Sequence, residues 1–337
     1  MIYTSIALSA LALTSAYSLP NARGVASVAT VRSTVSMVTG PPPAGFVWAD
    51  EDSSSSSASP AAASGASTVP AAASSKVFVL PDADAVGAEI RAAVEEAASK
   101  AIAERGHFAL AIPGGSVLKM LAGSAPAWAD KCTLAYVNHK AVAMDDADLA
   151  THAKAGKLFL DGWKGVNAIV MDGTADAKAE AASYEAQLKA LPPSVLPVNS
   201  EGLPVFDLML IGVGDDGHVG SLYPDRDEVM DDSGRWVLPV EMKTPGSITL
   251  SLPLMAASKE VVIAACGVSD KYPKGKSAAM ARAIEGEESP RSFPASGLRG
   301  VATWVLDVAA GGELSSDYAE CFALQMSRGD CNPVGVN

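Results

Sequence analysis

The segment Phe206-Asp-Leu-Met-Leu-Ile-Gly-Val-Gly-Asp-Asp-Gly-His218 decides the fold, because it joins a largely apolar run to a glycine-rich turn. A short, largely apolar run is typical of a strand buried on both faces of a parallel sheet. The three glycines permit a tight turn after this strand, and the turn holds His218 at the edge of the sheet. Histidine exchanges a proton near neutral pH, so the segment predicts a catalytic base at the end of a buried strand.

Strand-like and helix-like patterns alternate on both sides of this segment. Strands are expected at residues 77–80, 109–112, 134–137, 166–170, 206–211, 248–252, 261–265 and 302–306. Helices are expected at residues 84–104, around 118–121, at 174–191 and at 277–285, with Asp84 as the cap of the first. The alternation predicts an α/β fold in a single domain, with a mostly parallel, doubly wound sheet and flanking helices.

Composition limits the classes of partner. The chain has 337 residues, of which 49% are hydrophobic and 19% charged, enough to bury a sizeable core. A formal net charge of −13 argues against nucleic acid, whose backbone would repel such a surface. No apolar run approaches the roughly 20 residues of a membrane span, so no membrane partner is expected for the mature protein.

The first 75 residues differ in composition from the rest. Residues 1–49 contain no Asp or Glu, and an apolar stretch (Ile6-Ala-Leu-Ser-Ala-Leu-Ala-Leu13) precedes a region rich in Ser and Thr. This pattern resembles a bipartite plastid presequence, with mitochondrial or cytoplasmic location as alternatives. Residues 50–75 are rich in Ser, Ala and Pro and are expected to be a flexible linker. A folded domain is therefore expected at 76–314, followed by a tail at 315–337.

The cysteines and histidines lack the spacing of a metal site, so no metal or cofactor is expected. Cys266 ends an apolar run and is predicted to be a buried thiol. Cys321 and Cys331 lie near each other in the tail, and the sequence leaves their pairing open.

A second glycine turn, Pro113-Gly114-Gly115-Ser116, follows the expected strand at 109–112. Its glycines let the backbone approach an anion closely, and the amides at the start of the next helix point toward that position. An ordinary connection between strand and helix fits the same residues equally well. The spacing matches neither a P-loop nor a dinucleotide-binding fingerprint.

The segment from Phe206 to Pro224 resembles the signature of 6-phosphogluconolactonases, in the glucosamine/galactosamine-6-phosphate isomerase superfamily. The resemblance spans about residues 77–314 and includes Gly114-Gly115-Ser116, Ile248-Thr-Leu-Ser-Leu-Pro253, Gly267, Lys276, Phe293-Pro-Ala-Ser296 and Trp304-Val-Leu-Asp307. Sugar-phosphate deaminases of this superfamily share Asp-Gly-His but continue with a Phe-Asn-Glu-Pro-like segment. The continuation here, Ser221-Leu-Tyr-Pro224, favours the lactonases.

The resemblance implies hydrolysis of 6-phospho-D-glucono-1,5-lactone to 6-phospho-D-gluconate, in the oxidative pentose phosphate pathway, without a metal or cofactor. His218 would act as general base on a water molecule. Gly114, Gly115 and Ser116 would cradle the substrate phosphate, with Lys140 and Lys276 as cationic partners. Asp216 would orient the loop or the imidazole, or would only form the turn.

Several positions depart from the lactonase pattern. Asn138-His139-Lys140 replaces the usual Asp-Glu-Arg, and Ser247 replaces an arginine. The positive charge of the missing arginines is expected to be supplied by His152, Lys154 or Lys274. For His139, one of two interpretations is a solvated loop residue. The alternatives are a catalytically weak or dead sugar-phosphate-binding protein, a lactonase for another sugar phosphate, and a sugar-phosphate deaminase or isomerase. The sequence leaves the presequence cleavage site and the oligomeric state open.

Overall fold

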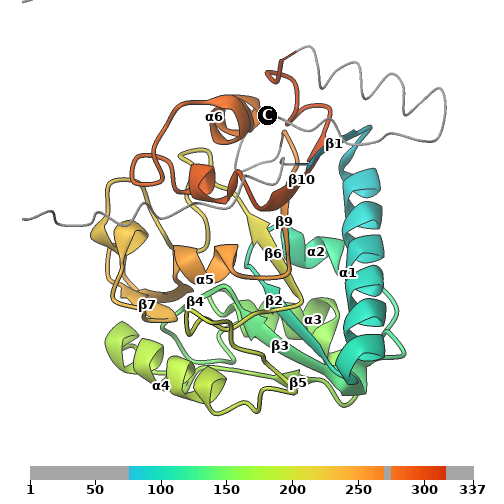
Figure 1. The fold of residues 1–337 in the computed structure, drawn as a ribbon, viewed down its shortest axis with the longest axis vertical. Helices are drawn as coiled ribbons and strands as arrows, with labels where there is room; N and C mark the ends of the chain where they lie inside the picture. Colours follow the sequence, from blue (N-terminus) through green and yellow to red (C-terminus); the bar gives the residue numbers. More distant parts are fainter. Residues whose placement is uncertain (1–75, 269–274, 316–337) are drawn as a thin grey trace, which may run out of the picture. The chain divides into compact units, whose positions relative to one another are not determined.

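The computed structural model describes residues 76–268 and 275–315 (Figure 1). All of them belong to one of the two compact units of the chain, Ala66–Asn337. The predicted presequence and linker, the tail after Ser315, Lys274 and the pair Cys321 and Cys331 lie outside the described residues.

The central sheet has seven strands, and every neighbouring pair is parallel. The predicted fold class is therefore confirmed. The strand at 166–170 is shorter than expected, because only Asn167 and Ala168 pair with the sheet. In spatial order the strands are β1 (Lys76–Leu80), β10 (Ala302–Asp307), β9 (Glu260–Ala265), β6 (Leu208–Gly212), β2 (Phe108–Ile112), β3 (Cys132–Tyr136) and β5 (Asn167–Ala168).

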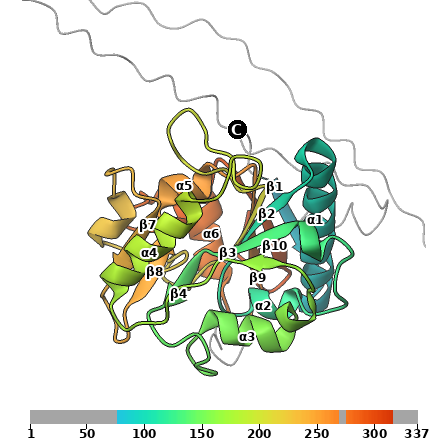
Figure 2. The same cartoon turned by 90° about the horizontal axis from the view of Figure 1, so that it is seen from below.

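Helices cover both faces of this sheet (Figures 1 and 2). One face packs on α1 (Ala83–Arg105), α2 (Val117–Met120) and α3 (Thr151–Leu158), and the other on α4 (Ala177–Lys189), α5 (Leu252–Ala256) and α6 (Ser277–Glu285). Alternate residues of β2 reach the two cores, since Leu110 packs with the first group of helices and Ala111 with the second. Short 3-10 helices lie in the connections: η1 (Ala129–Lys131), η2 (Leu160–Gly162), η3 (Asp227–Met230) and η4 (Pro294–Leu298).

A second, antiparallel sheet was not predicted. It consists of β4 (Asn138–Lys140), β8 (Ser247–Leu250) and β7 (Val237–Val240), in that order. The strand expected at 248–252 is thus a member of this small sheet and ends at Leu250, because Leu252 already begins α5. Strands of three or four residues are too short to give a recognisable alternation in the sequence.

The first helix begins slightly earlier than predicted. Asp82, and not Asp84, is its N-cap, since the Asp82 carboxylate accepts a hydrogen bond from the amide of Ala85 at 2.9 Å. Asp84 lies in the first turn, where its charge interacts favourably with the helix dipole.

The prediction for Cys266 is wrong in degree. Its side chain is only partly buried, just beyond the end of β9, whereas Cys132 in β3 is buried. Partial burial still raises the pKa of the Cys266 thiol to about 11. Within the described residues, no helix combines the length and apolar character needed to cross a bilayer.

A buried ion pair stabilises the amino-terminal edge of the sheet. Asp207 is 3% exposed and receives both terminal nitrogens of Arg105 as well as the amide of Ala109. Removing one partner of such a pair leaves a buried charge, which costs about 3–5 kcal/mol.

In Arg105→Ala the Asp207 carboxylate keeps Lys259, at 3.4 Å, as a cation. We therefore expect this variant to lower the free energy of unfolding by up to about 3 kcal/mol, at the lower end of the range for a broken buried pair, without changing kcat. Urea unfolding followed by circular dichroism measures this change. Lys178→Ala is the matched control, since Lys178 pairs with Glu241 on the exposed surface, where an ion pair contributes little to stability. Equal losses in the two variants would contradict the assigned role of the buried pair.

Candidate active site

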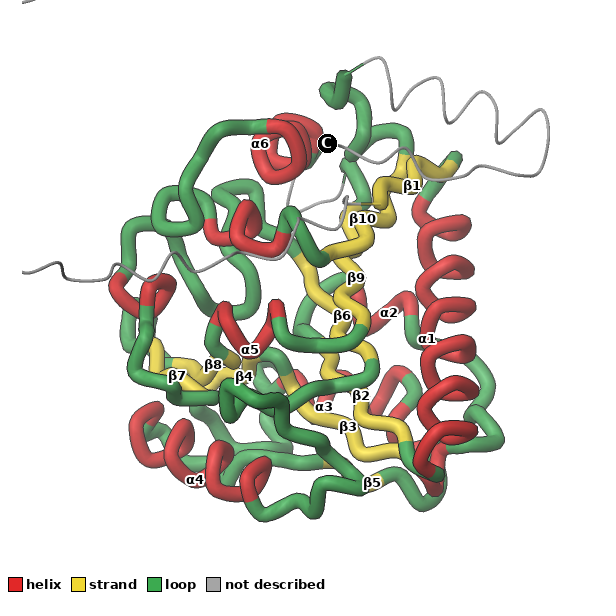
Figure 3. Tube along the Cα trace, viewed as in Figure 1, coloured by secondary structure: helices red, strands yellow, loops and turns green. Residues whose placement is uncertain are grey.

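Two glycine-containing loops leave neighbouring strands at the carboxyl edge of the large sheet (Figure 3). After β2, the next strand of the large sheet in sequence is β3, which lies beside β2 on the side away from β6. After β6, the next strand of this sheet is β9, which lies beside β6 on the side away from β2. In open α/β sheets, ligands bind at the point where the strand order reverses in this way. The loop after β2 carries Gly114-Gly115-Ser116, and the loop after β6 carries His218.

The loop after β6 folds back on itself. The amide of Gly214 donates to the carbonyl of His218 at 2.9 Å, and Val213 forms an isolated bridge with Val219. Gly217 has φ of 82°, a conformation that favours glycine, and a Cβ there would lie 2.5 Å from the ring of Phe293. The backbone therefore requires glycine at the turn that presents His218.

Asp216 fixes the protonation pattern of His218. Its carboxylate lies 2.5 Å from His218 Nδ1 and also accepts the backbone amide of His218 at 3.1 Å. The hydrogen bond with His218 lowers the pKa of Asp216 to about 2, so this carboxylate is ionised at neutral pH. An ionised carboxylate only accepts, so Nδ1 carries the proton, and in the neutral imidazole Nε2 then has the lone pair that a general base needs.

Gly214 and Tyr223 enclose the imidazole. A Cβ on Gly214 would lie 2.1 Å from His218 Nδ1, so only glycine permits this position of the ring. On another side the ring of Tyr223 lies 4.9 Å from the imidazole, measured between centroids. Lys243 donates to the Tyr223 hydroxyl at 3.2 Å and lies over its ring at 4.3 Å. Lys243 could not be predicted from the sequence, because a lysine in an irregular loop belongs to no motif.

Lys276 lies beside the same loop. It is 7% exposed and immediately precedes α6. Its ammonium group donates to the carbonyl of Val213 at 2.8 Å, at the start of the His218 loop.

The Gly114-Gly115-Ser116 loop lies between β2 and α2. Gly115 has φ of 81°, which favours glycine. A Cβ on Gly114 would lie 3.2 Å from the hydroxyl of Thr151, the first residue of α3. A Cβ on Gly212 would similarly contact Val117 of α2, so the two loops begin side by side.

The small sheet brings the atypical residues to the His218 loop. The Asn138 amide donates to the Ser221 hydroxyl at 3.2 Å, three residues beyond His218. Lys140 is directly opposite Ser247, so the two positions at which lactonases usually have arginine are partners in one ladder. Lys140 is exposed.

His139 lies between these residues, but it is only 1% exposed. The interpretation of His139 as a solvated loop residue is therefore wrong. It contacts α3, which also carries two of the residues considered as compensating cations: His152, whose Nδ1 lies 2.7 Å from the Tyr136 hydroxyl, and Lys154.

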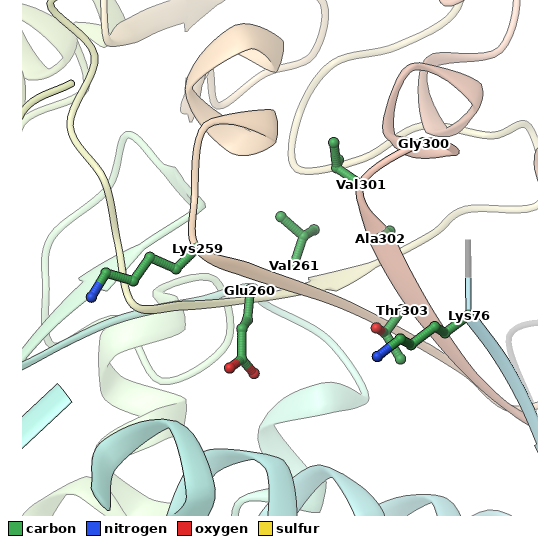
Figure 4. Close-up of a pocket in the computed structure, with 8 residues that line it drawn as sticks. All are labelled: Lys76, Lys259, Glu260, Val261, Gly300, Val301, Ala302 and Thr303. Carbon is green, nitrogen blue, oxygen red and sulfur yellow. The ribbon is translucent and has the colours of Figure 1, made fainter. Parts of the chain in front are cut away.

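A hollow lined by Lys76, Lys259 and Glu260 lies at the other edge of the sheet, where β1, β9 and β10 begin (Figure 4). Lys259 there pairs with Glu104 at 2.6 Å. Because ligands of this fold class bind at the carboxyl edge, we place the candidate site at the two loops. Among the described residues, no group of three or more His, Cys, Asp or Glu side chains is arranged to hold a metal ion.

The fold and the paired loops define an α/β protein whose ligand site lies at the switch point of a parallel sheet. Residues 81–305 match the family described as glucosamine-6-phosphate isomerases/6-phosphogluconolactonase. The chain belongs to this family.

Individual relatives agree with this assignment. The chain is 31% identical over 239 residues to a protein of Oryza sativa subsp. indica described as probable 6-phosphogluconolactonase 3, chloroplastic, covering 64% of this chain and 69% of the rice protein. It is 28% identical over 266 residues to the 6-phosphogluconolactonase of Rattus norvegicus, covering 73% and 96% of the two chains.

Solved structures share the fold. The crystal structure of 6-phosphogluconolactonase from Leishmania guyanensis superposes with a TM-score of 0.59 at 22% identity, over 72% of this chain and 99% of that one. A monomeric glucosamine-6-phosphate deaminase superposes with a TM-score of 0.51 at 17% identity, over 71% of this chain and 99% of that one. Lactonases and deaminases thus share this architecture, and the residues of the site must distinguish them.

Proposed function

We propose that this chain is a 6-phosphogluconolactonase that hydrolyses 6-phospho-D-glucono-1,5-lactone to 6-phospho-D-gluconate in the oxidative pentose phosphate pathway. The names of the rice and rat relatives support this substrate. The observation that carries the proposal is the position of His218, whose Nε2 lone pair is available beside a second glycine loop at the switch point.

In the proposed reaction, His218 Nε2 takes a proton from a water molecule while the water oxygen attacks the lactone carbonyl. Ionised Asp216 stabilises the resulting imidazolium through the hydrogen bond to Nδ1. The tetrahedral intermediate then collapses by breaking the bond between the carbonyl carbon and the ring oxygen. The imidazolium returns its proton to that departing oxygen, which yields the open-chain acid and regenerates the base.

The substrate phosphate is proposed to bind at Gly114, Gly115 and Ser116. Gly115 in its left-handed conformation lets the backbone approach a phosphate closely. Lys276 would supply charge from the His218 side, and Lys140 from the small sheet. Lysine supplies positive charge but, as a point charge, lacks the two-pronged contact that arginine makes with a phosphate.

Asp216 should contribute both orientation and charge. Asp216→Asn keeps an oxygen that accepts from Nδ1 but removes the charge, whereas Asp216→Ala removes both. A hydrogen bond to a charged group contributes about 1.5–3 kcal/mol, so we expect Asp216→Ala to lower kcat by about 10- to 100-fold and Asp216→Asn by less. Steady-state kinetics with matched unfolding curves measure this order; equal kcat in the three proteins would assign Asp216 to the turn alone.

Two other functions deserve a direct comparison. The substitutions at Asn138, His139 and Lys140 favour a sugar-phosphate-binding protein without activity, while the shared architecture allows a deaminase. The test presents the full chain with 6-phosphogluconolactone, the same lactone without phosphate, and glucosamine 6-phosphate. We expect hydrolysis of 6-phosphogluconolactone, much weaker hydrolysis of the lactone without phosphate, and no release of ammonia from glucosamine 6-phosphate. Ammonia release, or binding of 6-phosphogluconate without hydrolysis, would replace the proposed function with one of the alternatives.

We further propose that residues 1–49 direct the protein to a plastid, that residues 50–75 are a linker and that the catalytic domain spans 76–314. The acid-free composition of the first segment and the word chloroplastic in the name of the rice relative support this location. A reporter fused to residues 1–75 should accumulate in plastids. Mitochondrial or cytosolic fluorescence would contradict the proposal.

A further inference from the structure

His139 lies at the centre of β4 and points away from the His218 loop. Its partner across the ladder is buried Ile248, whereas Asn138 and Lys140 extend from the opposite face of the strand. The His139 side chain therefore lies apart from the groups that we propose to act on the substrate.

Two hydrogen bonds determine the state of this imidazole. Nδ1 lies 2.7 Å from the carbonyl oxygen of Lys140, which can only accept, so Nδ1 carries the proton. Nε2 lies 3.1 Å from the backbone amide of His152, which can only donate, so Nε2 carries a lone pair. Only a neutral imidazole protonated on Nδ1 satisfies both partners.

The hydrogen bond from the His152 amide stabilises the start of α3, because the first amides of a helix have no acceptor within the helix. The residue that precedes α3 is Ala150, which has no side-chain acceptor, and His139 supplies one from another strand. The first residue of α3 is Thr151, which packs against Gly114. One imidazole thus connects the strand that carries Lys140 to the helix that supports the glycine loop.

We infer that His139 is a positioning residue that holds Lys140 and the Gly114–Ser116 loop in one arrangement and thereby sets the affinity for the substrate phosphate. This inference rests on the proposed lactonase function and on the phosphate site placed there. A carboxylate at this position could accept the His152 amide but could not donate to Lys140, so the chain uses a side chain that does both.

The surroundings of His139 favour its neutral form. Burial is the main cause that lowers its pKa, and His152 and Lys154 of α3 act in the same direction. The hydrogen bond to the Lys140 carbonyl and the charge of Glu180 from α4 raise the pKa. The ring of Tyr136 from β3 packs against the imidazole, with the ring centroids 5.5 Å apart. Protonation would point an N–H at the His152 amide, so the arrangement is complete at neutral pH and is lost in acid, below the ordinary histidine value of about 6.5.

The test compares His139→Gln, His139→Glu and the wild-type full chain. Glutamine offers an acceptor and a donor in place of the two ring nitrogens, whereas glutamate offers acceptors only. We expect KM for 6-phosphogluconolactone to rise by about 10-fold in His139→Glu with little change in kcat, and to stay near the wild-type value in His139→Gln. KM should rise less at acid pH in His139→Gln than in the wild type, because an amide does not titrate and only the substrate phosphate, whose second pKa is about 6, then gains a proton.

His107→Gln is the matched control, since His107 lies just before β2 at the other edge of the sheet and contacts Thr133. A lower melting temperature with unchanged KM in His139→Glu, or an acid rise of KM that is equal in the wild type and in His139→Gln, would overturn the inference.

A binding measurement separates the inference from the proposed function. Inorganic phosphate should raise the melting temperature of the wild type and of His139→Gln, and raise that of His139→Glu less. If the wild type is inactive yet shows this pattern, the lactonase proposal fails and the role of His139 stands. If the wild type is active and all three proteins respond equally to phosphate, the role of His139 fails alone.

Discussion

His218→Ala is expected to lose nearly all enzymatic hydrolysis of 6-phosphogluconolactone, with kcat lower by about 10²- to 10⁴-fold, the usual contribution of a positioned general base. The fold should survive, because the imidazole lies at the surface of its loop and its side chain is 23% exposed. Stopped-flow measurement of proton release, corrected for spontaneous opening of the lactone, gives the comparison.

His107→Gln controls for the loss of a histidine as such and should retain the wild-type rate. A His218→Ala variant that keeps more than about one tenth of the wild-type kcat would assign the base to another group, since a general base contributes at least about 10²-fold.

Gly214→Ala is expected to have the second largest effect. The added methyl group would occupy the position of the His218 ring, 2.1 Å from Nδ1, and a side chain of this kind can rotate away at small cost to the fold. The base would then be displaced from Asp216 and from the water it activates. A displacement of about 1 Å costs about 100-fold in rate, so kcat should fall by that factor while the melting temperature changes little.

The matched control for this variant is Gly300→Ala. No atom lies within 4 Å of a Cβ placed on Gly300, so this substitution should leave both kcat and stability near the wild-type values. Full activity in Gly214→Ala would mean that the ring position seen here is not the one used in catalysis.

The sequence alone predicts the parallel sheet and the two glycine loops at which we place the candidate site. Buried parallel strands such as β6 and β9 read as continuous apolar runs, and the loops after β2 and β6 are marked by glycines. The order of the strands is not encoded locally, however. Only the structure places β2 beside β6, so that the loops that carry Gly114 and His218 leave neighbouring strands at the same edge of the sheet.

The small antiparallel sheet lies beyond sequence reasoning for a physical reason. Its strand β4 has three residues, and the burial of His139 depends on α3 and α4, which come later in the chain. A polar triplet therefore reads as a solvated loop until its neighbours are known. The same holds for Lys243, whose contact with Tyr223 joins two loop residues that are 20 positions apart and share no motif.

The structure also connects the atypical positions with one another. Lys140 and Ser247 are ladder partners, and Asn138 contacts Ser221 in the loop that carries His218. A change at one of these positions alters the surroundings of the others, so their substitutions are expected to be non-additive. We therefore expect the change in binding free energy for phosphate in the double variant Lys140→Arg with Ser247→Arg to differ from the sum of the changes in the two single variants.

The most direct test of the account is the rate of opening of freshly generated 6-phosphogluconolactone by the purified full chain, measured against spontaneous opening. We predict that the rate of opening exceeds the spontaneous rate by an amount that is proportional to protein concentration and is lost in His218→Ala. A folded wild-type protein that binds 6-phosphogluconate but adds nothing to the spontaneous rate would contradict it.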